Sequence, residues 1–154
     1  MSTSKNLIGA AVVAVAREWV GTPYVHQCSL KGAGTDCLGL LRGVWREVLG
    51  GEPEAVPAYS MDWSEPQGEE RLWQAAQRHL TEQSRPQDDL AIGDVILFRM
   101  RGGSVAKHLG IVSKNSACPA FIHAYETYGV VESPLSAPWA RRIVAAFAFP
   151  ERSN

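Results

Sequence analysis

Cys37 stands at the start of an apolar helical pattern, directly after a glycine-rich stretch. Further apolar side chains follow at the spacing of one helix face: Leu41, Val44 and Val48. Thr35 or Asp36 can cap the first free N–H groups, and Gly50-Gly51 ends the pattern. A thiol in the first turn lies at the positive end of the helix dipole, which favours thiolate over thiol. The position predicts a nucleophile, although a small buried hydrophobic residue is the commonest role of a free cysteine.

A cysteine nucleophile needs a histidine to take its proton and a third polar group to orient that histidine. His108 and His123 both lie in strand-like stretches further along the chain. Alternation around the first of them places His108 and Gly110 on one face of a strand and Leu109 on the other. If the Cys37 helix packs across these strands, Cys37 lies opposite His108, and His123 lies beside His108. The predicted order is nucleophile, base and orienting group.

The remaining pattern divides the chain into a helical first part and a strand-rich second part. Helical spacing indicates helices over about 5–20 and 69–80, with a proline-rich, irregular connection over about 50–68 between the second and third helices. Apolar runs and alternation indicate strands over 95–98, 107–112, 121–125, 129–132 and 143–148. The chain is therefore expected to form a single α+β domain over 1–154, with N-terminal helices packed on a mainly antiparallel sheet.

Two residues in the loop before Cys37 lie close to it in sequence. Tyr24 is either an aromatic side chain packed under this loop or part of the site, whereas His26 is expected to be an exposed loop residue. His79, in the third helical pattern, is expected on a helix surface. The net charge of −1 and a pI near 6.4 argue against a protein that binds nucleic acid through bulk charge.

No metal or cofactor is predicted for this chain. The three cysteines include no CxxC pair, and the four histidines include neither an i,i+4 pair nor an HExxH pattern. These absences argue against a structural zinc site and against a metal-dependent hydrolase. A disulfide between Cys28 and Cys37 is not expected, because it would consume the nucleophile and a domain of this size does not need it.

The apolar stretch over 6–16 follows one lysine and ends in Ala-Val-Ala, as a secretory signal peptide would. A core helix is favoured, because the apolar residues keep helical spacing beyond the supposed cleavage site: Ile8, Val12, Val15 and Trp19. No stretch is long enough to span a membrane. We therefore expect synthesis in the cytoplasm without a signal peptide.

Five blocks in this order resemble the NlpC-type family of cell-wall cysteine peptidases, which have a papain-like fold: 21–24, 35–40, 93–98, 107–112 and 122–124. By this resemblance Cys37 is the nucleophile, His108 the base and His123 the third polar residue. Tyr24 would contact the substrate or the oxyanion. Asp36 is either the helix N-cap or a carboxylate that receives a substrate ammonium group. The sequence departs from the family pattern at Leu38, where serine is usual.

The family's reaction is hydrolysis within the peptide stems of bacterial peptidoglycan, typically between γ-D-glutamate and a diamino acid. Leu38 makes the chain similar to the branch found in phage tails and gene transfer particles. The resemblance therefore implies a peptidase carried by a particle tail, with tail hub or fibre proteins as partners and the cell wall as the place of action. Two alternatives stay open: an amidase or acyl transferase with the same Cys–His pair, and a structural module of a tail or baseplate.

Overall fold

The computed structural model describes residues 3–56, 59, 70–84, 89–101 and 105–151. Its helices are α1 (Thr3–Glu18), α2 (Cys37–Val48), α3 (Arg71–His79) and α4 (Ala137–Ala140). Its strands are β1 (Ser29–Leu30), β2 (Gly34–Thr35), β3 (Thr81–Glu82), β4 (Val95–Phe98), β5 (His108–Lys114), β6 (Ala120–Tyr125), β7 (Gly129–Pro134) and β8 (Ile143–Ala148). The expected connection over 50–68 lies outside the described residues except for 50–56 and 59, which form neither helix nor strand.

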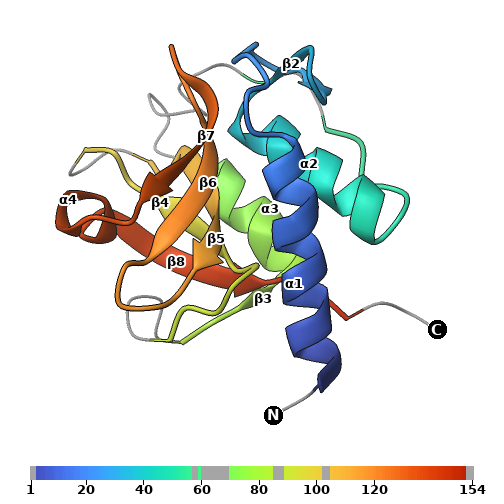
Figure 1. The fold of residues 1–154 in the computed structure, drawn as a ribbon. Coiled ribbons are helices and arrows are strands. Elements are labelled where there is room, and N and C mark those ends of the chain that lie inside the picture. The colour runs from blue at the N-terminus through green and yellow to red at the C-terminus, as the bar shows by residue number, and fades with distance from the viewer. Residues whose placement is uncertain (1–2, 57–58, 60–69, 85–88, 102–104, 152–154) are drawn as a thin grey trace.

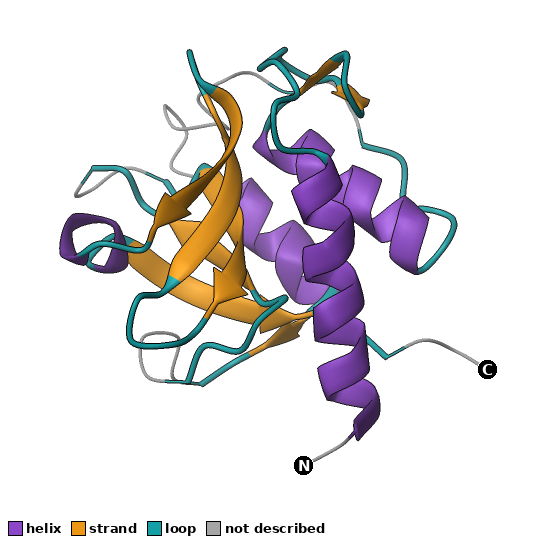
Figure 2. Ribbon diagram, in the orientation of Figure 1, coloured by secondary structure: helices purple, strands orange, loops and turns teal. Residues whose placement is uncertain are grey.

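A six-stranded antiparallel sheet forms the second part of the chain, in the order β3-β8-β4-β5-β6-β7. Helices α1, α2 and α3 gather on one side of this sheet, and α4 lies at its far side (Figures 1 and 2). The α+β architecture predicted from the sequence is therefore confirmed. The short strands β1, β2 and β3 and the helix α4 were not predicted, because elements of two to four residues leave no measurable periodicity.

Apolar side chains pack on both faces of the sheet. The larger core lies between the helices and residues such as Leu97, Leu109 and Phe147, and α1 contributes Ile8 and Val12 to it. A smaller core on the opposite face is built from these buried residues: Ile96, Phe98, Val112, Phe121, Ile143 and Ala146. Because both faces are covered, all four residues of β4 are buried, which explains its continuous apolar sequence. Within the described ranges, no helix is long and apolar enough to cross a membrane.

The loop before α2 folds back against the first turn of that helix. Ser29 Oγ donates a hydrogen bond to the carbonyl oxygen of Gly39 at 2.6 Å. A Cβ atom on Gly39 would lie 1.9 Å from the carbonyl oxygen of Cys28 and 2.5 Å from Thr35 Oγ1. Only glycine lets the β1–β2 hairpin approach α2 this closely. Gly39 is therefore required for the packing of the loop before Cys37 against the first turn of α2.

Candidate active site

Cys37 is the first residue of α2, and its side chain is buried. The backbone N–H of Gly39 donates to Asp36 Oδ1 at 2.7 Å, so Asp36 is the N-cap, as one of the two interpretations expects. The thiol donates a hydrogen bond to the carbonyl oxygen of Lys107, with Sγ and oxygen 3.8 Å apart. The backbone N–H groups of Leu109, Leu38 and Cys37 also face the sulfur. The sulfur therefore lies beside the main chain on both sides of His108.

His108 and His123 lie side by side on the neighbouring strands β5 and β6. His108 Nε2 and His123 Nδ1 are 2.8 Å apart, and His123 Nε2 is 3.0 Å from Ser133 Oγ. If His123 donates to Ser133, its Nδ1 accepts the proton of His108 Nε2, which leaves His108 Nδ1 as a base. A Cβ on Gly110 would lie 2.7 Å from the ring of Phe121 and 3.3 Å from His123 Cβ, so a glycine is needed here for the two strands to bring the histidines together.

Aromatic side chains enclose the histidine pair. The ring of Trp139, on α4, has its centroid 5.7 Å from that of His108 and 5.2 Å from that of His123. Phe98 packs against His108 at 5.7 Å, and Tyr125 stacks on His123 at 5.4 Å. This enclosure keeps water away from both imidazoles, and His123 is only 1% exposed.

Burial keeps the candidate nucleophile and base neutral. It raises the pKa of the Cys37 thiol to about 12, and the charge of Asp36 adds to the effect. The three backbone N–H groups that face the sulfur act in the opposite direction but are outweighed. Burial also lowers the pKa of His108 to about 3, with a contribution from His123, and that of His123 to about 4. The N–H groups at the helix start do favour the thiolate, as expected, but the expectation of a net preference for thiolate at neutral pH is wrong, because desolvation of the charged form dominates.

Asp36 has both carboxylate oxygens engaged and is almost inaccessible. Its Oδ2 accepts hydrogen bonds from the backbone N–H of Gln27, at 2.7 Å, and from the hydroxyl of Tyr59. His26 Nδ1 lies 3.7 Å from the same oxygen. A substrate ammonium group would have to replace one of these partners, so that second interpretation of Asp36 stays a prediction. His26 is half-buried rather than exposed, because it packs against the Tyr59 ring edge-on at a centroid distance of 5.2 Å.

Tyr24 is half-buried on the loop that runs to Cys37, and it pairs with Thr35 in an isolated bridge. Its ring packs against the main core, as the structural interpretation expects. Burial raises the pKa of its phenol, and a negative charge on Cys37 would raise it further, so the phenol and the thiol are near enough to interact. Contact of Tyr24 with a substrate or oxyanion stays a prediction.

Among the described residues, the other cysteines and His79 form neither a disulfide nor a metal cluster. Cys28, Cys37 and Cys118 are free thiols. His79 lies at the end of α3 and pairs with Glu54 at 2.8 Å, consistent with a helix-surface residue. Among the residues that the structure describes, no three His, Cys, Asp or Glu side chains gather where they could hold a metal ion.

A cavity of about 360 Å³ lies behind the site rather than at the thiol. It opens between α2, α3, residues 52–56 and Tyr59, and its wall is mostly apolar. Leu38 and Leu109, the neighbours of Cys37 and His108 in sequence, line it. The chemistry is therefore better located by the thiol and the imidazoles than by this cavity.

Sequence reasoning missed three residues of this site: Tyr59, Ser133 and Trp139. Ser133 follows the predicted strand over 129–132 and carries a hydroxyl, which is the only signal that could have marked it as a partner for His123. Tyr59 lies in the expected irregular connection, where no periodicity assigns it a neighbour. Trp139 belongs to a helix of four residues. All three reach the site through tertiary contacts.

Comparisons with known proteins identify related sequences and folds. Residues 21–148 match the sequence model of the NlpC/P60 family. A search of curated proteins gave no match. A lipoprotein-like NLP/P60 family protein from Staphylococcus aureus has a similar structure, with a TM-score of 0.61, 19% identity, and coverage of 97% of this chain and 43% of that one.

Two further solved structures are similar. An NlpC/P60 family protein from Bacillus cereus has a TM-score of 0.61 and 19% identity, with coverage of 90% of this chain and 39% of that one. NlpC2 from Trichomonas vaginalis has a TM-score of 0.57 and 18% identity, with coverage of 96% and 47%. The chain thus spans less than half the length of these proteins, and at such identities the likeness concerns the fold.

Proposed function

Because the chain belongs to the NlpC/P60 family, we propose that it is a cysteine peptidase that hydrolyses the stem peptides of peptidoglycan. The observation that carries this proposal is the arrangement of three side chains. Cys37 begins α2 with its sulfur against the main chain that flanks His108, and the His108 imidazole is paired with His123 at 2.8 Å. This arrangement supports nucleophilic attack by sulfur with assistance from a base.

The reaction begins from a neutral thiol and a neutral imidazole. The thiol proton, directed at the Lys107 carbonyl oxygen in the resting site, turns to His108 Nδ1 as the sulfur attacks the amide carbon. The pair His123–Ser133 holds the His108 ring and its tautomer. His108 then gives the proton to the leaving amine, and water hydrolyses the thioester to return the thiol.

The negative oxygen of the tetrahedral intermediate needs hydrogen-bond donors close to the sulfur. The first turn of α2 supplies them, because the backbone N–H groups of Cys37 and Leu38 have no acceptor within the helix and face Sγ. Tyr24 is near enough to the thiol to interact with it and offers a hydroxyl whose pKa is raised, so it stays protonated and can donate. We therefore assign it to the substrate or the oxyanion.

Two finer proposals go with this function. The bond cleaved is that between γ-D-glutamate and the diamino acid, which is the bond typical of the NlpC-type peptidases that the motifs resemble. The protein is carried to the cell wall by a phage-like tail, a proposal supported by Leu38 in place of the usual serine after the nucleophile. Co-purification with tail hub or fibre proteins of a particle tests the second proposal, and a free periplasmic enzyme with no particle would contradict it.

Mass spectrometry of purified stem peptides tests the reaction. We expect the native protein and Cys118→Ala to split the stem between D-glutamate and the diamino acid, and Cys37→Ala to leave it intact. Cys118 is the matched control, because it is an exposed free thiol outside the site. Cleavage by Cys37→Ala, or transfer of the acyl group to an added amine in place of hydrolysis, would reject the proposed mechanism.

A further inference from the structure

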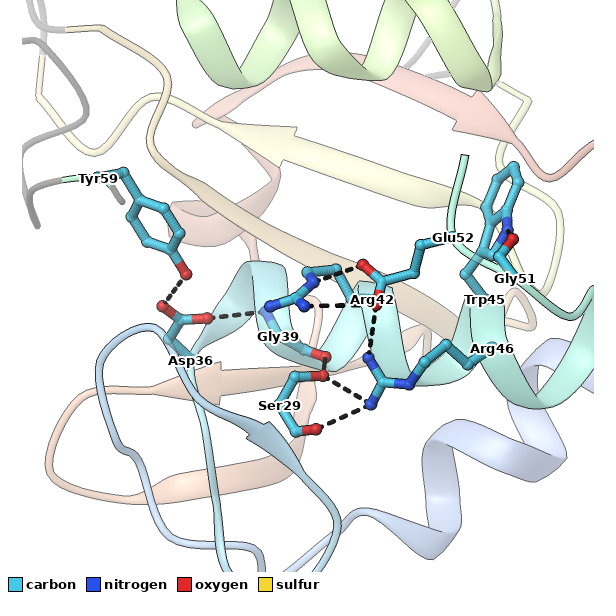
Figure 3. Close-up of polar contacts among 9 residues, drawn as sticks. All are labelled: Ser29, Asp36, Gly39, Arg42, Trp45, Arg46, Gly51, Glu52 and Tyr59. Atoms are coloured by element: carbon cyan, nitrogen blue, oxygen red, sulfur yellow. Dashed lines mark hydrogen bonds and ion pairs between the residues drawn. The ribbon is translucent and has the colours of Figure 1, made fainter. Parts of the chain in front are cut away.

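Tyr59 reaches the N-cap of α2 from a separate part of the chain. Its hydroxyl points at Asp36 Oδ2, while Oδ1 of the same carboxylate accepts the N–H of Gly39 (Figure 3). The carbonyl oxygen of Tyr59 accepts hydrogen bonds on the opposite side, from Gln27 Nε2 at 3.0 Å and from the ring of His26, whose Nε2 lies at 2.9 Å. The residue is therefore fixed at both its side chain and its backbone.

Residues 51–56 form the described segment that precedes Tyr59 in the chain, and charged groups tie this segment to α2. Glu52 accepts hydrogen bonds from Arg42, at 2.6 and 3.3 Å, and from Arg46, at 3.0 Å (Figure 3). Trp45 Nε1 donates to the carbonyl oxygen of Gly51 at 3.0 Å. Besides the contact of Gly51 with Trp45, two anchors involve charged groups. Glu52 binds Arg42 and Arg46 in the middle of α2, and Tyr59 binds the Asp36 cap beside Cys37.

The two anchors have different consequences for the thiol. Asp36 is a buried carboxylate directly before Cys37, and its negative charge opposes the formation of a second negative charge on the sulfur. A hydroxyl that donates to this carboxylate offsets part of its charge. Among the contacts of the described residues, none joins Glu52 to Asp36, and the charge of Glu52 is offset by Arg42 and Arg46.

We propose that Tyr59 is a positioning residue for the nucleophile: its hydroxyl fixes the Asp36 carboxylate on the N-cap and offsets the charge of that carboxylate beside Cys37. This inference rests on the proposed function, because it takes Cys37 as the nucleophile. The titratable groups that interact with the thiol are Asp36, Tyr24 and Tyr59, and the main chain next to His108 borders the sulfur. His26 on the preceding loop and Arg42 on α2 face the Asp36 carboxylate. Of these, only Tyr59 donates a side-chain hydrogen bond to Asp36 among the described contacts.

The test is the rate at which iodoacetamide alkylates Cys37 between pH 7 and 10, followed by mass spectrometry of the Cys37 peptide. We expect Tyr59→Phe to slow alkylation about threefold at a given pH, a shift of about half a pH unit in the titration of the thiol. Glu52→Gln is the matched control, because it loosens the same segment without touching Asp36. It removes a negative charge, so any electrostatic effect of its own would speed alkylation.

Asp36→Asn provides a second test, since asparagine also caps helices but carries no charge. In this background Tyr59→Phe should no longer change the alkylation rate, because there is no carboxylate charge to offset. Equal rates for Tyr59→Phe and the native protein would overturn the inference, as would equal slowing by Glu52→Gln or an undiminished effect in Asp36→Asn. Alkylation needs no peptidoglycan, so these results can be separated from a failure of the native protein to cleave stem peptides.

Discussion

Mild acid should destabilise this fold through the buried histidine pair. Burial lowers the pKa of His108 from 6.5 to about 3 and that of His123 from 6.5 to about 4. Below about pH 6.5 these histidines are therefore protonated in the unfolded chain but stay neutral in the folded chain. Because the unfolded state binds more protons, the free energy of unfolding falls as the pH falls. At about pH 5.5 each unfolded histidine gains about 1.4 kcal/mol from protonation, so the pair costs roughly 3 kcal/mol relative to pH 7.5.

Urea unfolding followed by tryptophan fluorescence measures this loss between pH 7.5 and 5.5. In this range the carboxylates whose pKa is lowered by ion pairing, such as Glu52 and Glu132, stay ionised in both states. The double variant His108→Gln/His123→Gln is the control, because glutamine does not titrate and its stability should change much less. An unchanged free energy of unfolding in the native protein, or an equal loss in the double variant, would refute the assignment of a neutral buried pair.

Three substitutions test other contacts of the site. Gly39→Ala places a Cβ 1.9 Å from the carbonyl oxygen of Cys28, so we expect the free energy of unfolding to fall by about 2 kcal/mol. Urea titration measures this loss, and a smaller loss would show that the β1–β2 hairpin can move. Ser133→Ala removes the partner of His123 Nε2, and peptidase assays should show kcat reduced about tenfold with KM little changed. An unaffected kcat would show that Ser133 does not help to position the histidine pair. Asp36→Ala removes the N-cap, and thermal unfolding should show a loss of at least about 1 kcal/mol, which Asp36→Asn should restore in part.

The parts of the site that could be predicted depend on local order in the sequence. Asp36 and Cys37 were placed at the start of a helix because capping and apolar spacing act within a few residues, and α2 begins at Cys37 as expected. The strand period put His108 and His123 on neighbouring strands, and the register of β5 with β6 brings their rings together. Each of these predictions needed only the order of residues within one element and the pairing of adjacent strands.

The residues that escaped prediction join the site across long sequence distances. Tyr59 meets Asp36 from 23 positions away, and neither its neighbours nor its residue type indicates that contact. Trp139 covers the histidines from α4, whose four residues carry no pattern of their own. The ionisation state of the Cys37 thiol was also predicted wrongly because a long-range effect decides it. The helix dipole is a local property that the sequence indicates, whereas the burial that outweighs it is produced by the whole fold.

Burial of Cys37 and His108 also constrains the proposed reaction. An isolated thiolate at Cys37 and an isolated imidazolium at His108 are each disfavoured, but the two charges attract each other if they form together in the same enclosure. In the proposed reaction we therefore expect proton transfer to accompany attack on the substrate. At that stage the N–H groups of Cys37 and Leu38 would stabilise the oxyanion, and the His123–Ser133 pair would stabilise the charge that develops on His108. A site of this kind keeps its thiol mostly protonated until a carbonyl group is in place.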